Sequence, residues 1–532
     1  MGNYLNPGNE KFRRMIQSEI YVDKTGMIKY TNSVLDTAQN YVCVSRPRRF
    51  GKSMAANMLT AYYSRGCNSK ELFGKFEIAK DKDFEKYLNQ YNTIFLNMQE
   101  FLSRSHNVEE LIDRVKKLVI RDLKMEYPEV DYFDDTDLIE CMQDIYAQMQ
   151  YPFVVIIDEW DVLIRDEASN QKIQDDYINF LRGMFKGTEP TKYIQLAFLT
   201  GILPIKKLKT QSALNNFHQY SMLNPGPLAS YIGFTEDEVS ALCQKYGQNF
   251  EEVRRWYDGY LLGNYHVYNP NAVTSLLLDG TFQSYWSETS TYDSMVPFIN
   301  MDFDGLKTAI LEMLSGAAVP VLVTSFKNDM VSVVNKDDVL TLLIHLGYLA
   351  YNQQTQMAYI PNEEIRREFL TAVTSNRWNE LLTFQQESAE LLDATLAMDE
   401  NAVAAGIGKI HEEYTSVIQY HNENSLSCVL TIAYLSSIQY YFKPIRELPT
   451  GRGFSDFVFL PKPEYRYDFP ALVVELKWNK NAETALDQIK RQHYPASIAS
   501  YTGDILLVGV NYDKKTKVHE CRIEKYLKSG EK

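Results

Sequence analysis

The residue types best suited to chemistry lie in segment 45–54, which reads Ser-Arg-Pro-Arg-Arg-Phe-Gly-Lys-Ser-Met. It follows the apolar run 41–44 and precedes a helix-forming stretch. A strand that passes through a Gly-Lys-Ser turn into a helix typically cradles phosphates, because backbone N–H groups at the helix start surround the anion. In such a loop Lys52 would reach the β- and γ-phosphates and Ser53 would hold Mg²⁺. The general pattern begins with a glycine, and Arg46 occupies that position.

Other residues of this loop are candidates for nucleotide contacts. Gly51 and Met54 flank the Lys-Ser pair and complete the turn into the helix. Arg48 and Arg49 add positive charge, either beside the phosphates or toward phosphates in another molecule. A solvated turn ahead of the helix is the alternative reading of both arginines, and the sequence leaves it open.

A second acidic element supports the phosphate loop. The five consecutive apolar residues 153–157 precede Asp158 and Glu159. Uninterrupted apolar strands are typical of parallel sheets buried on both faces, and α/β proteins bind ligands at the carboxyl ends of such strands. We expect Asp158 to hold Mg²⁺ through water and Glu159 to polarise the water that attacks the γ-phosphate. An ordinary core strand with an acidic exit is the alternative.

Two further apolar runs, 93–98 and 194–201, fit the same sheet. Thr200 stands at the carboxyl end of the second run, where its hydroxyl could sense the γ-phosphate. A hydroxyl before a glycine turn is also a common way to end a strand. Together these runs predict a parallel-sheet nucleotide-binding domain over residues 1–223.

The C-terminal part of the chain carries a second group of candidate catalytic residues. In the apolar strand 471–478, Glu475 and Lys477 share one face because side chains alternate along a strand. Asp456 lies on the preceding predicted strand, and Gln488 lies on the helix that follows. Asp456 and Glu475 could ligate one Mg²⁺ while Lys477 positions or deprotonates the attacking water and Gln488 stands near the metal. This D…E-x-K arrangement resembles the core of PD-(D/E)XK nucleases.

Two more carboxylates are rivals for an accessory role at this second site. Glu423 opens a helix-like stretch, and Glu447 lies just upstream of the predicted strand that carries Asp456. Between the two sites, residues 224–375 show helix-period patterns and few catalytic clusters. Thr235 and Glu238 there form a capping-box pattern.

Several motifs together resemble the AAA-ATPase-like family of bacteria, whose members carry a C-terminal PD-(D/E)XK nuclease-like domain. The matching segments spread over nearly the whole chain: 21–25, 45–53, 157–161, 233–235, 256–260, 268–270 and 285–286. In that family the phosphate loop normally has the R-P-R-R-F-G-K-S form, so Arg46 is no local defect. The resemblance also implies that residues 21–25 help form the nucleotide pocket and that the middle region serves interaction or regulation.

We therefore expect an α/β protein of three parts. Residues 1–223 would form a P-loop NTPase domain with a parallel sheet. Residues 224–375 would form a mostly helical, winged-helix-like lid or regulatory region. Residues 376–532 would form an α/β domain like that of restriction endonucleases.

Composition limits the partners. The net charge is −14, which argues against a wholly basic nucleic-acid coat, but residues 443–532 carry 16 Lys and Arg against 12 Asp and Glu. The six cysteines are scattered without a C-x-x-C pair, so we expect neither disulfides nor zinc and predict a cytoplasmic location. No apolar run approaches the length needed to cross a membrane.

These observations lead to one hypothesis and two alternatives. A P-loop ATPase that uses ATP and Mg²⁺ would control a fused, Mg²⁺-dependent nuclease-like domain that acts on DNA. The first alternative is an ATP-dependent switch whose tail binds a partner or nucleic acid without cleaving it. The second is a scaffold in which neither site turns over efficiently. The sequence permits a homo-oligomer but does not indicate one.

Overall fold

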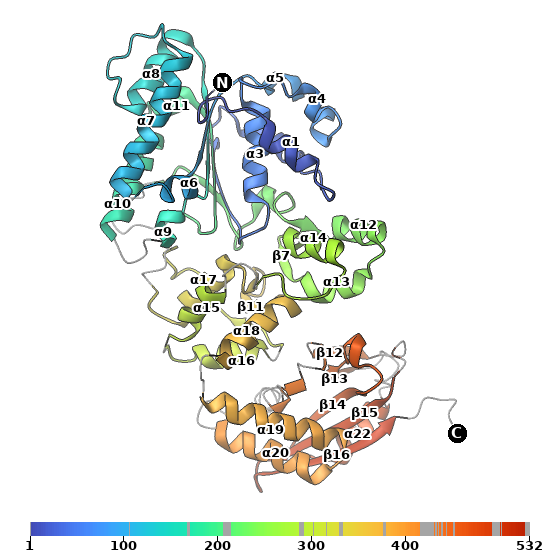
Figure 1. The fold of residues 1–532 in the computed structure, drawn as a ribbon. Helices are drawn as coiled ribbons and strands as arrows, with labels where there is room; N and C mark the ends of the chain where they lie inside the picture. Colours follow the sequence, from blue (N-terminus) through green and yellow to red (C-terminus); the bar gives the residue numbers. More distant parts are fainter. Residues whose placement is uncertain are drawn as a thin grey trace. The chain divides into compact units, whose positions relative to one another are not determined.

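The computed structural model divides the chain into two compact units, residues 1–285 with 321–361 and residues 286–320 with 362–532. It describes residues 2–105, 107–166, 171–205, 214–286, 292–301, 303–314, 316–328, 333–375, 379–414, 430, 433–434, 436–437, 440–442, 444–450, 453–491, 501 and 503–526. Figure 1 shows the elements of each unit.

The first unit is built on a five-stranded sheet of order β2-β3-β4-β1-β5, in which every strand is parallel to its neighbours. Its strands are β1 (Tyr41–Ser45), β2 (Asn92–Asn97), β3 (Phe153–Asp158), β4 (Ile194–Gly201) and β5 (His218–Tyr220). Both β1 and β3 are buried along their whole length, as expected for a parallel sheet covered on both faces. The carboxyl ends therefore meet at one edge, where β4 lies between β1 and β3.

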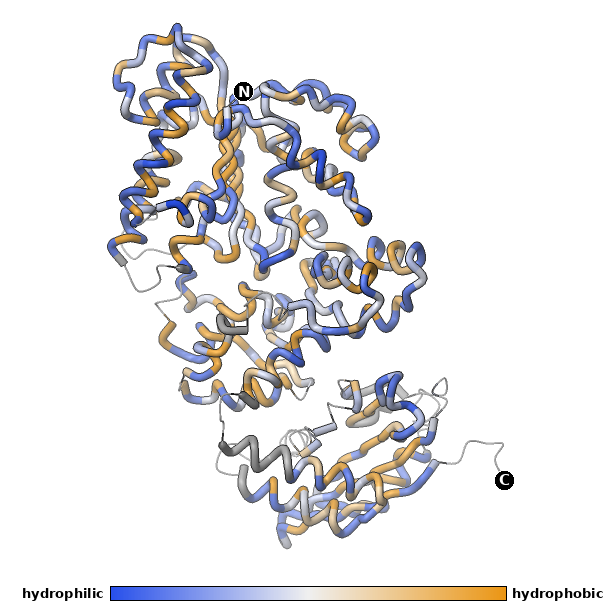
Figure 2. The backbone as a smooth tube through the Cα atoms, viewed as in Figure 1, coloured by the Kyte–Doolittle hydropathy of each residue, from blue (hydrophilic) through white to orange (hydrophobic). Residues whose placement is uncertain are grey.

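Helices cover both faces of this sheet (Figure 1). One face carries α7 (Val108–Glu126), α8 (Leu138–Met149), α10 (Gln171–Phe185) and α11 (Pro190–Tyr193), and the other carries α1 (Glu10–Ile16), α3 (Lys52–Tyr63), α4 (Lys70–Phe73) and α5 (Phe84–Tyr87). Figure 2 shows that the strands are hydrophobic and lie between helices that carry both hydrophilic and hydrophobic residues. In α7, for example, Leu111, Val115 and Val119 recur at helical spacing and are buried.

Further short elements complete this core. They are α2 (Met27–Val34), η1 (Glu77–Lys80), α6 (Met98–Leu102), α9 (Val162–Asp166) and η2 (Gly226–Leu228). The segments α6 and α9 directly follow β2 and β3, so they stand at the carboxyl edge of the sheet.

A smaller part of the first unit follows the sheet. It contains β6 (Phe234–Thr235), α12 (Glu236–Tyr246), α13 (Phe250–Tyr257), β7 (Tyr260–Leu262), β8 (Tyr265–Tyr268), α14 (Pro270–Asp279), α17 (Lys336–Leu346), β10 (Ala350–Asn352) and β11 (Met357–Tyr359). The predicted capping box is present at the start of α12, where the backbone N–H of Thr235 donates to Glu238 at 2.7 Å. The strands β10 and β11 pair as an antiparallel hairpin after α17.

The second unit combines helices with a mixed sheet of order β12-β13-β14-β15-β16. Its strands are β12 (Ile445–Thr450), β13 (Gly453–Phe459), β14 (Ala471–Trp478), β15 (Ile505–Asp513) and β16 (Val518–Tyr526), with β9 (Val319–Pro320) outside this sheet. Its helices are α15 (Tyr292–Ile299), α16 (Leu306–Leu314), α18 (Glu363–Ser375), α19 (Asn379–Leu396), α20 (Glu400–Tyr414), η5 (Pro463–Tyr465) and α22 (Ala482–Arg491). Among its described strand pairs, β14 with β15 is parallel and the others are antiparallel, and α22 lies between β14 and β15 in the sequence.

The helix α22 packs on the face of this sheet that carries Val473, through Leu486 and Ile489. Because side chains alternate, Glu475 and Lys477 lie on the same face as Val473. Gly509 is the partner of Glu475 in the β14–β15 register. A Cβ at Gly509 would stand 2.6 Å from the carbonyl oxygen of Ala482, so the absence of a side chain allows α22 to approach the sheet.

We predict that Gly509→Ala destabilises the second unit. The added Cβ would also lie 3.0 Å from the Cβ of Ala485, and such overpacking typically costs about 1–3 kcal/mol. The melting temperature of the full chain should fall by several degrees. Gly408→Ala in α20 is the matched control, because its added Cβ would meet only His519 at an ordinary 3.5 Å. Equal melting temperatures for the two variants would contradict this packing.

Candidate functional site

The loop between β1 and α3 leaves the start of α3 open. Arg49 and Gly51 have φ angles of 66° and 93°, which turn the chain through the left-handed region before the helix begins at Lys52. Gly51 is the N-cap residue, and because glycine has no side chain it makes no capping hydrogen bond. Nothing lies within 4 Å of the position that a Cβ on Gly51 would take. Gly51, Lys52, Ser53 and Met54 line a cavity, so the start of α3 is accessible, and the N–H groups of a helix start suit an anion.

Lys52 is buried, with only 4% of its surface exposed. Its Nζ donates to the carbonyl oxygen of Pro47 at 2.8 Å. Burial lowers the pKa of Lys52, while the negative charges of Glu159, Asp161 and Asp158 act in the opposite direction. The ammonium group is thus held by the main chain at the carboxyl edge of the sheet, within electrostatic range of these carboxylates.

A cavity of about 500 Å³ adjoins this loop. Among its lining residues are Tyr21, Val22, Lys24, Arg49, Gly51, Lys52, Ser53, Met54, Glu159, Asn271, Thr274 and Leu278. The structure thus brings together Arg49, Gly51, Lys52, Ser53 and Met54 from the predicted loop contacts. Three residues of segment 21–25 also line the cavity. That this segment helps form a nucleotide pocket, as the family resemblance implies, stays a prediction.

Three predicted residues lie outside the lining of this cavity. Arg48 is exposed on the loop, so its solvated alternative stays open. Asp158 and Thr200 are fully buried near the carboxyl ends of β3 and β4. The hydroxyl of Thr200 donates to Oδ1 of Asp158, so the two predicted side chains contact each other directly.

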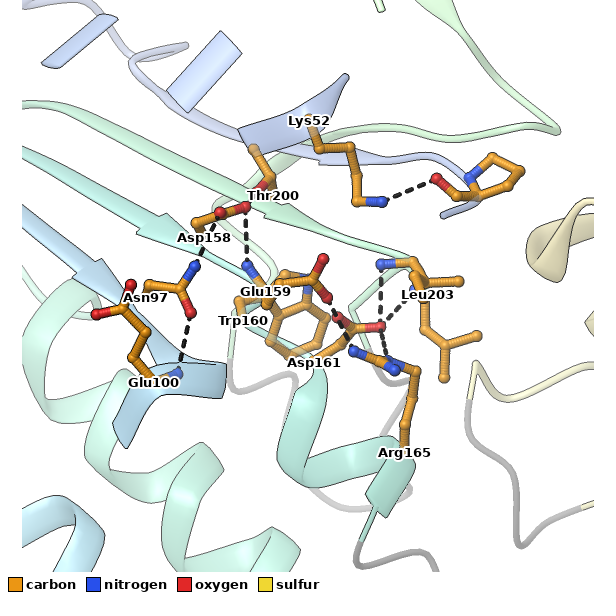
Figure 3. A network of polar contacts seen from close by, with 12 residues as sticks. Lys52, Asn97, Glu100, Asp158, Glu159, Trp160, Asp161, Arg165, Thr200 and Leu203 are labelled. Atoms are coloured by element: carbon orange, nitrogen blue, oxygen red, sulfur yellow. Dashed lines mark hydrogen bonds and ion pairs between the residues drawn. The ribbon is translucent and has the colours of Figure 1, made fainter. Parts of the chain in front are cut away.

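Asp158 is held by one residue that the sequence analysis did not select. Asn97, at the end of β2, donates from Nδ2 to Oδ2 of Asp158 at 3.1 Å. The other end of its amide is fixed, because Oδ1 accepts the backbone N–H of Glu100 at 3.1 Å. Figure 3 shows Asn97 between these two groups. This contact depends on β2 lying beside β3, which the sequence alone does not show. The one local indication in the sequence is a polar residue at the end of an apolar run.

Glu159 follows β3 in a left-handed conformation, with a φ of 53°. Its Oε2 accepts from Nη2 of Arg165 at 2.9 Å (Figure 3). Burial raises the pKa of Glu159, while the positive charges of Lys52 and Arg165 lower it. Arg165 was also missed by the sequence analysis.

Asp161 connects this pair to the strand that carries Thr200. Its Oδ2 accepts from Nε of Arg165 at 3.0 Å and from the backbone N–H groups of Ile202 and Leu203 at 3.0 and 2.7 Å. Asp161 itself is fully buried. The loop after β4 is therefore tied to α9 through a single carboxylate oxygen.

Arg46, which replaces the first glycine of the general loop pattern, points into the protein. It is fully buried, and its Nη1 donates to the carbonyl oxygens of Ser45 and Tyr220 at 2.9 and 3.3 Å. Burial lowers its pKa to about 9. Arg46 is absent from the residues that line the cavity. Its contacts join the loop to β5.

The second predicted site lies on β14. Lys477 donates from Nζ to Oε1 of Glu475 at 2.7 Å, and their side chains are only 9% and 2% exposed. Gln488 lies on α22, which covers the same face of the sheet, and its side chain is partly buried. The β13–β14 register ends at the pair Phe457–Val474, and Asp456 and Glu475 are the next residues along the two strands.

Three carboxylates that the sequence predicts at this site fall outside the described side chains. The side chain of Asp456 and that of Glu447 are not described, and Glu423 lies in an undescribed segment. Among the side chains that are described, no three His, Cys, Asp or Glu residues gather as metal ligands. Oxygen donors such as Ser53, Asp158 and Glu475 are of the kind that Mg²⁺ prefers.

Comparisons with known proteins agree with this architecture. Residues 7–210 match the family described as a predicted AAA-ATPase, and residues 421–521 match the PD-(D/E)XK nuclease superfamily. The chain thus combines an AAA-ATPase-like domain with a PD-(D/E)XK nuclease superfamily domain, which confirms the resemblance seen in its motifs. None of the described helices is long and apolar enough to span a bilayer.

One curated relative extends over almost the whole chain. The "Uncharacterized protein in vnfD 5'region" of Azotobacter chroococcum mcd 1 is 23% identical over 514 residues, which is 93% of this chain and 93% of that protein. Its name states no activity.

Two solved structures align with lower similarity. The ORC2 protein of Aeropyrum pernix in its ADPNP-ADP complexes is 11% identical, with 68% of this chain and 98% of that chain covered and a TM-score of 0.29. The replication initiator DnaA bound to AMPPCP and single-stranded DNA is 13% identical, with 70% and 96% covered and a TM-score of 0.27. The fold assignment rests on the strand order described above.

We predict that Asp161→Ala destabilises the first unit, because it removes the buried acceptor of two backbone N–H groups and one of the two carboxylates that contact Arg165. Loss of one partner from a buried ion pair typically costs about 3–5 kcal/mol. The melting temperature of the full chain should fall clearly. Asp161→Asn keeps an oxygen acceptor and should cost less. A melting temperature of Asp161→Ala equal to that of the unmodified chain would contradict the anchoring role.

Proposed function

We propose that the first unit binds ATP with Mg²⁺ and hydrolyses it to ADP and phosphate. One observation carries this proposal. The open start of α3, the buried Lys52 and the carboxylate of Glu159 all meet at one cavity. That combination provides N–H donors and a cation for phosphates together with a base for water.

Each residue has a role that follows from its place. N–H groups at the start of α3 bind the phosphates, and Lys52 exchanges the carbonyl oxygen of Pro47 for phosphate oxygens. Ser53 and Asp158 would hold Mg²⁺, which when bound neutralises charge on the β- and γ-phosphate oxygens. Thr200 and Asn97 fix the direction of the Asp158 carboxylate through hydrogen bonds to its two oxygens. Glu159 accepts a proton from the attacking water.

The remainder of the cavity suits a nucleobase. Its walls include the apolar or aromatic side chains of Phe12, Tyr21, Met58, Tyr231 and Leu278. Its volume of about 500 Å³ lies within the range of small-ligand pockets, which are mostly apolar with a few polar anchors. A nucleotide therefore fits this cavity better than free phosphate does.

For the second unit we propose Mg²⁺-dependent cleavage of DNA. The pairing of Glu475 with Lys477 supports this proposal, because burying both charges on an apolar strand is costly unless they serve a ligand. Lys477 would orient the attacking water, while Glu475 and Asp456 would hold the metal and Gln488 would support it. Binding of nucleic acid without cleavage is the alternative, since the Glu475–Lys477 contact is compatible with both.

We further propose that the nucleotide state of the first unit controls the second, and that the protein acts in the cytoplasm. The presence of both domains in one chain supports the first idea. The five described cysteines, all of which are free thiols, support the second.

Lys52→Ala should abolish ATP binding, because it removes the cation that faces the phosphates. We expect the dissociation constant, measured by titration calorimetry with Mg²⁺ present, to rise at least about 100-fold. Lys70→Ala is the matched control, because Lys70 is exposed and pairs with Glu85 at 2.7 Å, away from the cavity lining. Unchanged affinity in Lys52→Ala would refute the phosphate-site assignment.

Lys477→Met should abolish cleavage of linear DNA in the presence of Mg²⁺ or Mn²⁺. The substitution removes the ammonium group but keeps much of the buried stem. Lys480→Ala, which alters an exposed lysine just beyond β14, should cleave at the rate of the unmodified chain. Cleavage that persists in Lys477→Met would show that another site is responsible. Retained DNA binding with no cleavage by the unmodified chain would instead favour the non-nucleolytic alternative.

A further inference from the structure

Arg165 is placed to control the direction of the Glu159 carboxylate. Its guanidinium group contacts two carboxylates at once, Oε2 of Glu159 through Nη2 and Oδ2 of Asp161 through Nε. The side chain of Arg165 is only 7% exposed, so burial limits its movement. A planar guanidinium with fixed donor directions suits this double contact, whereas a lysine ammonium would act as a single point of charge.

Asp161 holds Arg165 in turn. This carboxylate is fully buried and accepts backbone N–H groups of Ile202 and Leu203 in addition to Arg165. Both backbone donors come directly after Thr200 and Gly201 on β4. The main chain of the loop after β4 therefore anchors the carboxylate that holds Arg165.

Of the two carboxylate oxygens of Glu159, Oε2 accepts a hydrogen bond and Oε1 points away from that contact. Arg165 takes Oε2, and within the described part of the chain Oε1 has no hydrogen-bond partner. The side chain is 21% exposed and lines the cavity. The backbone of Glu159 is fixed in the left-handed region. The contact with Arg165 therefore determines the direction in which the side chain points.

We propose that Arg165 is a positioning residue for ATP hydrolysis: anchored by Asp161, it fixes Glu159 so that Oε1 receives the attacking water in the cavity. This inference rests on the ATPase function proposed above. In the reaction the water oxygen bonds to the γ-phosphorus and the bond from that phosphorus to the β–γ bridging oxygen breaks. A water proton passes to Oε1 and then to solvent, leaving ADP and phosphate.

The test compares steady-state ATP hydrolysis by the full chain and by four variants: Arg165→Met, Arg165→Lys, Glu159→Gln and the double variant Glu159→Gln/Arg165→Met. A misdirected base typically costs up to about 100-fold in rate. We expect Arg165→Met to lower kcat by about 10- to 100-fold, with the ATP dissociation constant changed less than about threefold. Arg165→Lys should fall between this variant and the unmodified chain, because it keeps the charge without the double contact.

The double variant distinguishes positioning from a general structural effect. If Arg165 acts through Glu159, the double variant should be no slower than Glu159→Gln alone, because residues that act as a unit are not additive. A further loss of the same factor in the double variant would overturn the proposal. So would faster hydrolysis in Arg165→Met, which would mean that Arg165 restrains Glu159 instead of orienting it.

Melting temperatures and ATP affinities separate the remaining outcomes. If Arg165→Met does not fold, the comparison of Arg165→Lys with the unmodified chain decides, and an unchanged kcat there overturns the proposal. If the unmodified chain binds ATP but does not hydrolyse it, the proposed ATPase function and this inference both fail. If Glu159→Gln abolishes hydrolysis while Arg165→Met retains the full rate, only the role of Arg165 fails.

Discussion

The first unit depends on positive and negative side chains that are buried together at the carboxyl edge of its parallel sheet and offset one another's charge. Lys52 and Arg165 supply positive charge there, and Asp158, Glu159 and Asp161 supply negative charge. Each of these groups would be costly to bury alone. Together they are tolerated because the strands β1, β3 and β4 end side by side and bring them within hydrogen-bonding distance of one another or of the main chain. A charged ligand bound at this edge would change the electrostatic environment of all five side chains.

The loop before α3 shows how the same constraint shapes the backbone. Arg46 fills the place of a glycine but sends its side chain into the protein, where it donates to carbonyl oxygens of Ser45 and β5. The turn is made instead by Arg49 and Gly51, both in the left-handed region. The part of the loop that leads into α3 thus stays accessible at the cavity, while its first position contacts the sheet. This division explains how a loop that departs from the general pattern can still present an open helix start.

Local sequence patterns predicted the strands and the residues that end them, because burial on both faces requires uninterrupted apolar runs such as 153–157. The parallel-sheet domain and the α/β class of the C-terminal domain were both predicted correctly. The contacts of Asn97 and Arg165 could not be predicted, because they depend on which strands are neighbours and on how the chain turns after Glu159. The order β2-β3-β4-β1 places Asn97 beside Asp158 although 61 positions separate them in sequence. Nothing in the residue types alone distinguishes Arg165 from an exposed helical arginine.

The most direct test of this account is a crystal structure of the full chain with Mg²⁺ and a non-hydrolysable ATP analogue. We expect phosphates at the start of α3, with Nζ of Lys52 moved from the carbonyl oxygen of Pro47 to a phosphate oxygen. We also expect the base to occupy the cavity beside Tyr21 and Oε1 of Glu159 to face the γ-phosphate while Arg165 keeps its contact with Oε2. An analogue bound elsewhere, with Lys52 still on Pro47 and the cavity empty, would contradict the account.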